Sequence, residues 1–380
     1  MTPGVKSNIV EIGAGMNEEQ QSAGSSWWER TNGLWRQLQV RHLRVALGSG
    51  LSLLFLWLAF RDVPISQVVA AFGHVDYRFV ALALALVLVS PLARAARWRL
   101  LYHPDQKGLS HLRLAEVLLI GQMLNIVVPA RVGEVARIFF VGRLQGRSRA
   151  RTLGTIAVEK WLDIVMLLLL LLLVPAFISL PPWFRDSRGA LAAFVIAFFA
   201  AALLISYGKD WLLTLVQLLS HFLPESWRGR VHRAADLALG SLDVLRSPWV
   251  GLQLQGWSLI IWSLSILVNY VIFLALGLSL PFAAALFLLA VLQVGVAVPS
   301  APGKLGVFHY LCILALGVFG LEKGAALGYA VLLYFVVFGP PSLLGALFLW
   351  WESVRRRKEE LALEFSSAAQ NPTPSQEMDG

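Results

Sequence analysis

The sequence predicts an all-α polytopic integral membrane protein, with about six full spans plus two re-entrant helical hairpins arranged as an inverted repeat. Three observations lead to this fold class: long apolar runs, basic segments between them, and two apolar runs that Pro and Gly interrupt. Of the 380 residues, 57% are hydrophobic and 14% are charged, whereas soluble domains average about 45–50% apolar and about 25% charged residues. This composition excludes an ordinary soluble domain.

The charge distribution indicates a membrane location and does not favour a nucleic-acid partner. The formal net charge is +9, but the Lys and Arg residues lie between apolar runs and form no basic stripe interleaved with aromatics. This is the positive-inside pattern, which predicts a multi-pass protein of the cytoplasmic (inner) membrane with both termini in the cytoplasm. The single cysteine, Cys312, lies in an apolar segment. We therefore expect no disulfide, no metal site and no cofactor.

Three regions are expected along the chain. Residues 1–42 form a polar N-terminal tail with an interfacial helix and no signal peptide, because Trp and Arg near its end suit the headgroup layer. Residues 43–351 form the transmembrane domain, and residues 352–380 form a polar cytoplasmic tail.

The full spans are apolar runs bounded by charged or turn-forming residues. They are residues 43–60, 79–93, 155–180, 189–207, 251–278 and 325–351, the last with an expected kink at Pro340 and Pro341. Between the fourth and fifth spans, residues 209–248 carry arginines among acids, which predicts one or two amphipathic helices on the inner surface.

Residues 114–128 are too short for a span, because an apolar helix of that length rises about 22 Å, against a hydrocarbon core of ~30 Å. Pro129 and Gly133 then interrupt it, and strongly basic segments flank the excursion on both sides. Two basic flanks predict that the chain enters from the cytoplasm and turns back, as a re-entrant hairpin.

Residues 282–298 and 305–321 form the second expected hairpin, around the breaker-rich sequence at 299–306. Two ordinary spans are an equal alternative for this pair. With a hairpin, the halves 43–180 and 189–351 have the same order of elements from opposite sides of the membrane. Many transporters use this inversion, and their broken helices meet near the midplane.

A helix is expected to restart after each break, and helix N-termini favour phosphate or carboxylate groups. Arg131 and Lys304 add positive charge beside the two restarts, which predicts a phosphate cradle formed by the two hairpin tips. A compatible alternative is that Arg131 pairs with Glu134 or Glu159 and neutralises a buried acid.

Glu159 and Asp163 are spaced i,i+4, so they share a helix face and repel each other if both are charged and unpaired. Arg137, Arg131, a proton or a cationic substrate could compensate them. Burial and a like neighbour raise a carboxyl pKa, which makes the pair a candidate proton-coupling site. The alternative is an ion pair with basic residues at the inner interface.

Arg94, Arg97 and Trp98 lie at the end of the second span. We expect them to anchor the helix end against anionic headgroups, or to recruit anionic lipid to a lateral entrance. His309 is expected to be a satisfied polar residue, because no other ligand lies at metal-binding spacing with it.

The sequences PARVGEVAR (129–137), EKWLD (159–163) and PGKLGVFH (302–309), preceded by RAARW (94–98), resemble the transmembrane region of the lysylphosphatidylglycerol synthases, also called the flippase-like domain family. The resemblance covers residues 43–351. Its motif residues are Pro129, Arg131, Gly133, Glu134 and Arg137 in the first hairpin, Glu159 and Asp163 in the next span, and Pro302, Gly303 and Gly306 in the second hairpin. The sequence departs from the family at Lys160 (usually Arg), Lys304 (frequently Gly) and His309 (often Glu).

The resemblance implies translocation of a lipid without the synthase activity, since we expect no room for a synthase domain after the last span. The expected substrate is an amphiphilic, anionic or zwitterionic (glyco)phospholipid or polyprenyl-linked lipid. Its headgroup would pass through a polar groove lined by Arg131, Glu134, Arg137, Glu159, Asp163 and Lys304.

Two other functions remain open. One is a membrane-embedded transferase with Glu134 or Asp163 as base, although the sequence has no nucleotide-binding or metal motif. The other is an accessory scaffold in lipid or lipid-linked glycan biosynthesis, which would bind a partner protein through residues 209–248.

Overall fold

The computed structural model describes residues 50, 54–61, 75–128, 132–177, 208–221, 224–295 and 302–370, with isolated positions among 63–73 and 189–200. All of the named elements in this part of the chain are helices. They are α3 (Tyr77–Leu100), α4 (His111–Val127), α5 (Val132–Leu144), α6 (Arg149–Leu173), η1 (Val174–Ala176), α9 (Lys209–Ser220), α10 (Glu225–Leu239), η2 (Gly240–Arg246), α11 (Pro248–Ala275), α12 (Phe282–Gly295), η3 (Pro302–Lys304), α13 (Leu305–Gly317) and α14 (Lys323–Gln370).

Three of these helices are long and apolar enough to cross a membrane: α3, α11 and the part of α14 from Lys323 to Glu360. They coincide with the expected spans at 79–93, 251–278 and 325–351. The all-helical architecture is therefore confirmed for the described residues, and the number of spans and their inverted arrangement stay predictions. The polar N-terminal tail, most of the first span and most of the fourth span lie outside the described residues.

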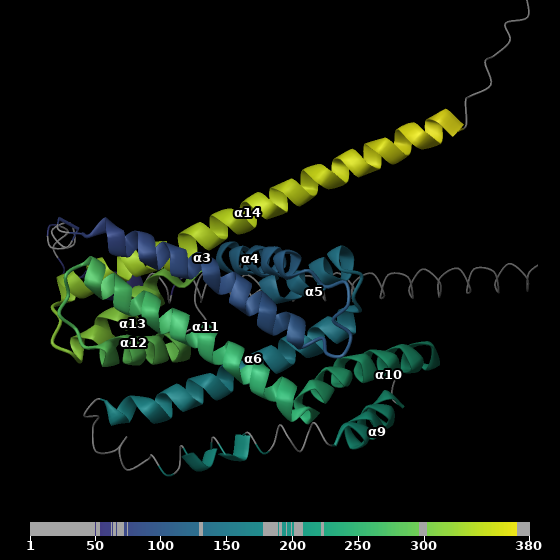
Figure 1. Ribbon diagram of the computed structural model, residues 1–380, viewed down its shortest axis with the longest axis horizontal. Coiled ribbons are helices and arrows are strands. Elements are labelled where there is room, and N and C mark those ends of the chain that lie inside the picture. The colour runs from purple at the N-terminus through teal and green to yellow at the C-terminus, as the bar shows by residue number, and fades with distance from the viewer. Residues whose placement is uncertain are drawn as a thin grey trace, which may run out of the picture.

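Helices α3 and α11 lie side by side through the body of the molecule (Figure 1). They are antiparallel: the Asp76 amide donates to the Ala275 carbonyl at one end (2.9 Å), and Arg97 Nη1 donates to Ser258 Oγ nearer the other (3.0 Å). The Asp76 side chain also caps α3 by accepting from the Arg78 amide at 2.9 Å. The pair gives the other helices a fixed frame.

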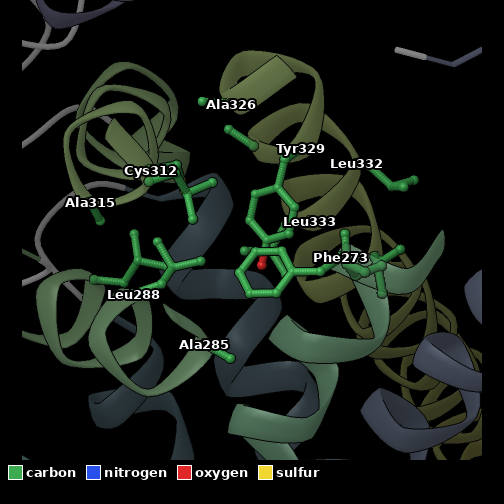
Figure 2. Close-up of a cluster of buried hydrophobic side chains, with 14 of the residues drawn as sticks. Phe273, Ala285, Leu288, Cys312, Ala315, Ala326, Tyr329, Leu332 and Leu333 are labelled. Carbon is green, nitrogen blue, oxygen red and sulfur yellow. The ribbon is translucent and has the colours of Figure 1, made fainter. Parts of the chain in front are cut away.

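An apolar core joins α3 and α11 to the last three helices. Figure 2 shows Phe273, Leu288, Cys312 and Tyr329 packed together in it. The Phe273 and Tyr329 rings lie 4.8 Å apart, and the Tyr329 hydroxyl donates to the carbonyl of Asn269 at 3.1 Å. This contact fixes α11 against α14 beside the cavity described below.

Helices α4 and α5 form a tight helical hairpin, with the helix interrupted between Val127 and Val132 as the sequence predicts. The Gly133 amide donates to Asn125 Oδ1 at 2.7 Å, which caps the start of α5. Gly133 also lies directly against the backbone carbonyl of Gly121, where any side chain would collide. Pro129, like Arg131, lies outside the described residues, and re-entry into the membrane stays a prediction.

The second break lies between α12 and α13. Gly303 and Lys304 have φ angles of 75° and 55°, so both adopt the left-handed conformation, which glycine tolerates without strain. The Tyr334 hydroxyl of α14 donates to the Gly303 carbonyl at 2.8 Å and holds this turn. Residues 296–301 lie outside the described residues.

Several element boundaries differ from expectation. Helix α6 begins at Arg149 instead of near residue 155. Its first turns come before the apolar run and are held in the helix because they pack against α10 and η2. In the described part of residues 209–248 the chain forms α9, α10 and the 3₁₀ helix η2, so the expected helices are present, and their place on the inner surface stays a prediction. Helix α14 continues past residue 351 to Gln370, so the first part of the expected tail is helical, and it projects beyond the body (Figure 1).

The two prolines expected to kink the last span lie inside α14, whose helical assignment continues through both. Proline at 341 cannot donate to the carbonyl of Val337, which would be its helical partner. Gln122 Nε2 of α4 lies 3.5 Å from that carbonyl and supplies a donor from a neighbouring helix.

The contact at Gly133 makes a testable prediction. In Gly133→Ala the new Cβ would lie 1.9 Å from the Gly121 carbonyl oxygen, so we expect the free energy of unfolding to fall by about 1–3 kcal/mol. Thermal unfolding of the detergent-purified protein measures this. Gly229→Ala is the control, because nothing lies within 4 Å of its Cβ position on α10. An equal midpoint for the two variants would contradict the close approach of α4 and α5.

Candidate functional site

A cavity of about 350 Å³ lies where the two helix breaks meet the α3–α11 pair. It is lined by residues of α3, α4, α5, α6, α11, α12, η3, α13 and α14. Glu134 and Arg137 come from the first hairpin, and Gly303 and Lys304 come from the second. The cavity is therefore built from both halves of the chain.

The two breaks contact each other directly. A Cβ at Gly303 would lie 3.8 Å from Ile126 Cγ2 and 3.9 Å from the Ile126 carbonyl oxygen, at the end of α4. Ile126 itself lines the cavity. The polypeptide thus brings the end of α4 and the start of α13 to one side of the same space.

Glu159 of α6 is the central anion of the site. It is 3% exposed, and its two carboxylate oxygens receive hydrogen bonds from Arg137 Nη1 and Nη2 at 3.4 and 2.5 Å. Arg97 Nη2 lies 3.8 Å from the same carboxylate. Two arginines on different helices therefore compensate one buried acid.

Arg97 joins three helices. It is 1% exposed, its Nη1 lies 2.9 Å from Asp163 Oδ1 of α6, and the same atom donates to Ser258 Oγ of α11. Arginines thus compensate both acids of the i,i+4 pair, as the ion-pair alternative of the sequence analysis expected. The other alternative, a pair that needs a proton or a cationic substrate, is not required by this geometry.

The position of Arg137 is fixed by an aromatic ring as well as by Glu159. Its guanidinium lies 4.1 Å from the centroid of the Trp98 ring, a distance typical of a cation–π contact. Trp98 in turn donates from Nε1 to Thr155 Oγ1 at 3.1 Å and is 1% exposed. A cation held by a ring and a carboxylate has little freedom to move.

Arg97 and Trp98 are therefore not headgroup anchors or parts of a lateral entrance, and this expectation was wrong. Arg97 forms an ion pair with Asp163, and Trp98 donates a hydrogen bond to Thr155, both inside the protein, so neither side chain reaches the lipid. Arg94, the third member of that group, lines the cavity.

Glu134 and Lys160 form the outer part of the site. Glu134 Oε1 lies 3.5 Å from Lys160 Nζ, and the two side chains are 23% and 49% exposed. Since surface ion pairs contribute only about 0–1 kcal/mol, this pair is easily exchanged for other partners. Glu134 Oε2 is buried and has no donor among the described residues.

The remaining predicted residues are distributed as follows. Asp163 does not line the cavity and lies behind its wall with Arg97. Pro302 lies in η3 and Gly306 is buried in the first turn of α13. His309 Nδ1 contacts the Leu305 carbonyl one turn earlier, which fits the expected satisfied polar residue.

Two neutral polar residues that hold or line the site were not predicted from the sequence. Ser258, which accepts from Arg97, and Asn269, which lines the cavity, both lie within the apolar helix α11. The one available signal was the presence of polar side chains in a run long enough to span a membrane. Among the described residues, no three His, Cys, Asp or Glu side chains gather closely enough to hold a metal ion.

Comparison with known proteins agrees with these features. Residues 45–345 match the family model described as the lysylphosphatidylglycerol synthase TM region. The chain belongs to this family. It is also 24% identical over 332 residues to a UPF0104 membrane protein of Pyrococcus horikoshii, covering 81% of this chain and 96% of that protein. A UPF0104 membrane protein of Methanothermobacter thermautotrophicus is 24% identical over 291 residues, covering 72% and 86% of the two chains.

The Arg137–Glu159 pair makes a second prediction. Arg137→Met leaves the Glu159 carboxylate buried with only the more distant Arg97, so we expect a loss of about 3–5 kcal/mol in the free energy of unfolding. Combining it with Glu159→Leu removes the uncompensated charge, and Arg97 keeps Asp163. We expect the double variant to be more stable than Arg137→Met alone in thermal unfolding. Strictly additive losses would contradict the pairing.

Proposed function

We propose that this protein translocates an amphiphilic lipid, with an anionic or zwitterionic headgroup, across the membrane through the cavity between the two helix breaks. Membership of a membrane-protein family and three helices of span length support a location in the bilayer. The function rests on one observation above the others: a charged cavity enclosed by otherwise apolar helices. Ionisable groups in such a place mark substrate pathways in membrane proteins.

The charge of the cavity wall favours an anionic group. Four cationic side chains line it against two carboxylates, and both carboxylates already have cationic partners. The cations are Arg94, Arg137, Lys160 and Lys304. Arginine and lysine are the usual partners of phosphate oxygens, so a lipid phosphate suits this wall.

Much of the remaining wall is apolar. Its side chains include Leu86 and Val87 of α3, Leu264 and Val268 of α11, and Phe338 of α14. A headgroup that enters the charged part can keep the start of its acyl chains against these residues. The tails themselves stay in the bilayer, because a cavity of about 350 Å³ has no room for them.

A transferase acting through a carboxylate base finds less support. Of the two carboxylates considered as bases, Asp163 is paired with Arg97 Nη1 at 2.9 Å and does not line the cavity, and Glu134 Oε1 lies 3.5 Å from Lys160 Nζ. A general base must reach the proton that it removes, and Asp163 faces away from the space where a substrate would lie.

Reconstitution tests the proposal. Liposomes with tail-labelled phosphatidylglycerol, phosphatidylinositol or phosphatidylethanolamine are treated with an impermeant quencher, with and without an imposed pH gradient. We expect the full-length protein to expose inner-leaflet label faster than protein-free liposomes for at least one lipid. Transport of none of them, with folded protein, would contradict the proposed function.

Lys304 provides the matched substitution. Lys304→Gln removes a positive charge from the cavity wall, and since a hydrogen bond to a charged group contributes about 1.5–3 kcal/mol, we expect transport to slow by about tenfold or more. Lys358→Gln removes the same charge from the exposed end of α14 and should leave the rate unchanged. Equal rates for the two variants would show that this part of the cavity is not on the pathway.

A further inference from the structure

Six neutral hydrogen-bonding side chains line the cavity in addition to its charged groups. They are Ser90, Gln122, Asn125, Ser265, Asn269 and Gln293, from α3, α4, α11 and α12. A phosphate and two acyl chains need few of them. Gln122, Asn125 and Ser265 each make one hydrogen bond within the protein. Polar groups left unpaired in a low-dielectric site cost about 1–3 kcal/mol each, so the remaining hydrogen-bonding capacity of this wall indicates a ligand with many hydrogen-bonding groups of its own.

Asn269 is the clearest case. The residue is 3% exposed, and its backbone carbonyl is fixed by the Tyr329 hydroxyl. Its side-chain Nδ2 has no acceptor among the described residues, although the residue lines the cavity. Buried amide donors are nearly always paired in folded proteins. This side-chain amide is therefore available to donate a hydrogen bond to a ligand in the cavity.

The cavity also offers unused acceptors. Ser265 Oγ donates to the Ile261 carbonyl at 3.1 Å, which leaves its oxygen lone pairs free to accept. Glu134 Oε2 is buried without a donor among the described residues. Asn125 lines the same cavity and uses its Oδ1 to accept from the Gly133 amide. A wall with both donors and acceptors suits hydroxyl groups, since each hydroxyl donates once and accepts twice.

Arg94 lies beside these groups, close enough to Asp163 and Glu159 for electrostatic attraction. In the part of the chain that the structure describes, Arg94 has no ion pair, whereas Arg97, one turn further along α3, takes Asp163. The guanidinium of Arg94 can therefore bind a phosphate without breaking an existing pair. An ammonium group, in contrast, would meet a wall with a net positive charge, in which Glu159 is paired with Arg137 and Glu134 Oε1 lies 3.5 Å from Lys160.

We propose that the cavity selects lipids whose headgroup is a hydroxyl-rich ring, a sugar or cyclitol, carried on a phosphate. Arg94 binds the phosphate, and Asn269 and Ser265, deeper along the α3–α11 pair, bind the ring hydroxyls. The volume of about 350 Å³ lies near the lower end of small-molecule sites, which are about 300–1,000 Å³, and suits a headgroup alone. This inference rests on the proposed function, because it names the substrate class of the same cavity.

Binding of three lipids with identical acyl chains tests the assignment. Phosphatidylinositol, phosphatidic acid and phosphatidylethanolamine are each titrated onto the purified full-length protein, and bound lipid is counted by native mass spectrometry. We expect phosphatidylinositol to bind about tenfold more tightly than phosphatidylethanolamine, with phosphatidic acid between them, since one good hydrogen bond contributes about 0.5–1.5 kcal/mol and a charged one more.

Two variants distinguish the contacts to the headgroup ring from the contacts to the phosphate. Asn269→Leu should weaken the binding of phosphatidylinositol severalfold and leave the binding of phosphatidic acid unchanged. Arg94→Gln should weaken the binding of both lipids by the same factor. Arg357→Gln, on the exposed part of α14, is the matched control for the lost charge. If Asn269→Leu does not fold, Ser265→Ala tests the same ring contact with a smaller expected loss.

The possible failures are distinct. Equal binding of phosphatidylinositol and phosphatidylethanolamine, or an equal effect of Asn269→Leu on phosphatidylinositol and phosphatidic acid, would overturn the headgroup assignment. Translocation of phosphatidylethanolamine in liposomes would leave the proposed function standing in that case. Selective binding of phosphatidylinositol without translocation of any lipid would instead support the site and overturn the transport function.

Discussion

The buried carboxylate of Glu159 is the constraint on which the site depends. A charge that is 3% exposed is tolerated only when it is paired and hydrogen-bonded, and here Arg137 of α5 and Arg97 of α3 contact it from two helices. Arg97 then reaches Ser258 of α11, and Arg137 is covered by Trp98. One acid thus holds four helices in register, and it fixes the edge of the first hairpin that faces the cavity.

The two helix breaks line one cavity within this arrangement of helices. Because Gly133 lies against Gly121, the first hairpin is thin enough for Glu134 and Arg137 to line a shared cavity. The left-handed turn at Gly303, held by Tyr334, brings Lys304 to the same space. The result is a chamber with paired acids, available donors and an apolar wall. Such a chamber suits a molecule that is polar at one end and apolar at the other.

Sequence patterns located the breaks and offered Arg137 as one possible partner of Glu159, but they did not find the partner of Asp163. A short apolar run followed by Pro and Gly has a local physical cause, so the ends of α4 and α5 were predictable. Arg97 was assigned to the lipid surface because arginines at span ends usually extend to the headgroups, and its partner Asp163 comes from a helix much later in the chain. No sequence pattern singled out Asn269, since an amide in an apolar helix becomes informative only when the neighbouring helices are known.

The central claim is that a wet, polar chamber lies within the apolar helices, and thiol labelling tests it most directly. With Cys312, the only native cysteine, replaced by Ala, a cysteine at Ser265 faces the cavity and one at Leu267 faces outward on the same helix. In liposomes, a small charged methanethiosulfonate should modify the cysteine at position 265, and added phosphatidylinositol should slow that reaction, while position 267 stays unreactive. Equal lack of reaction at both positions would mean a dry interior and would contradict the account.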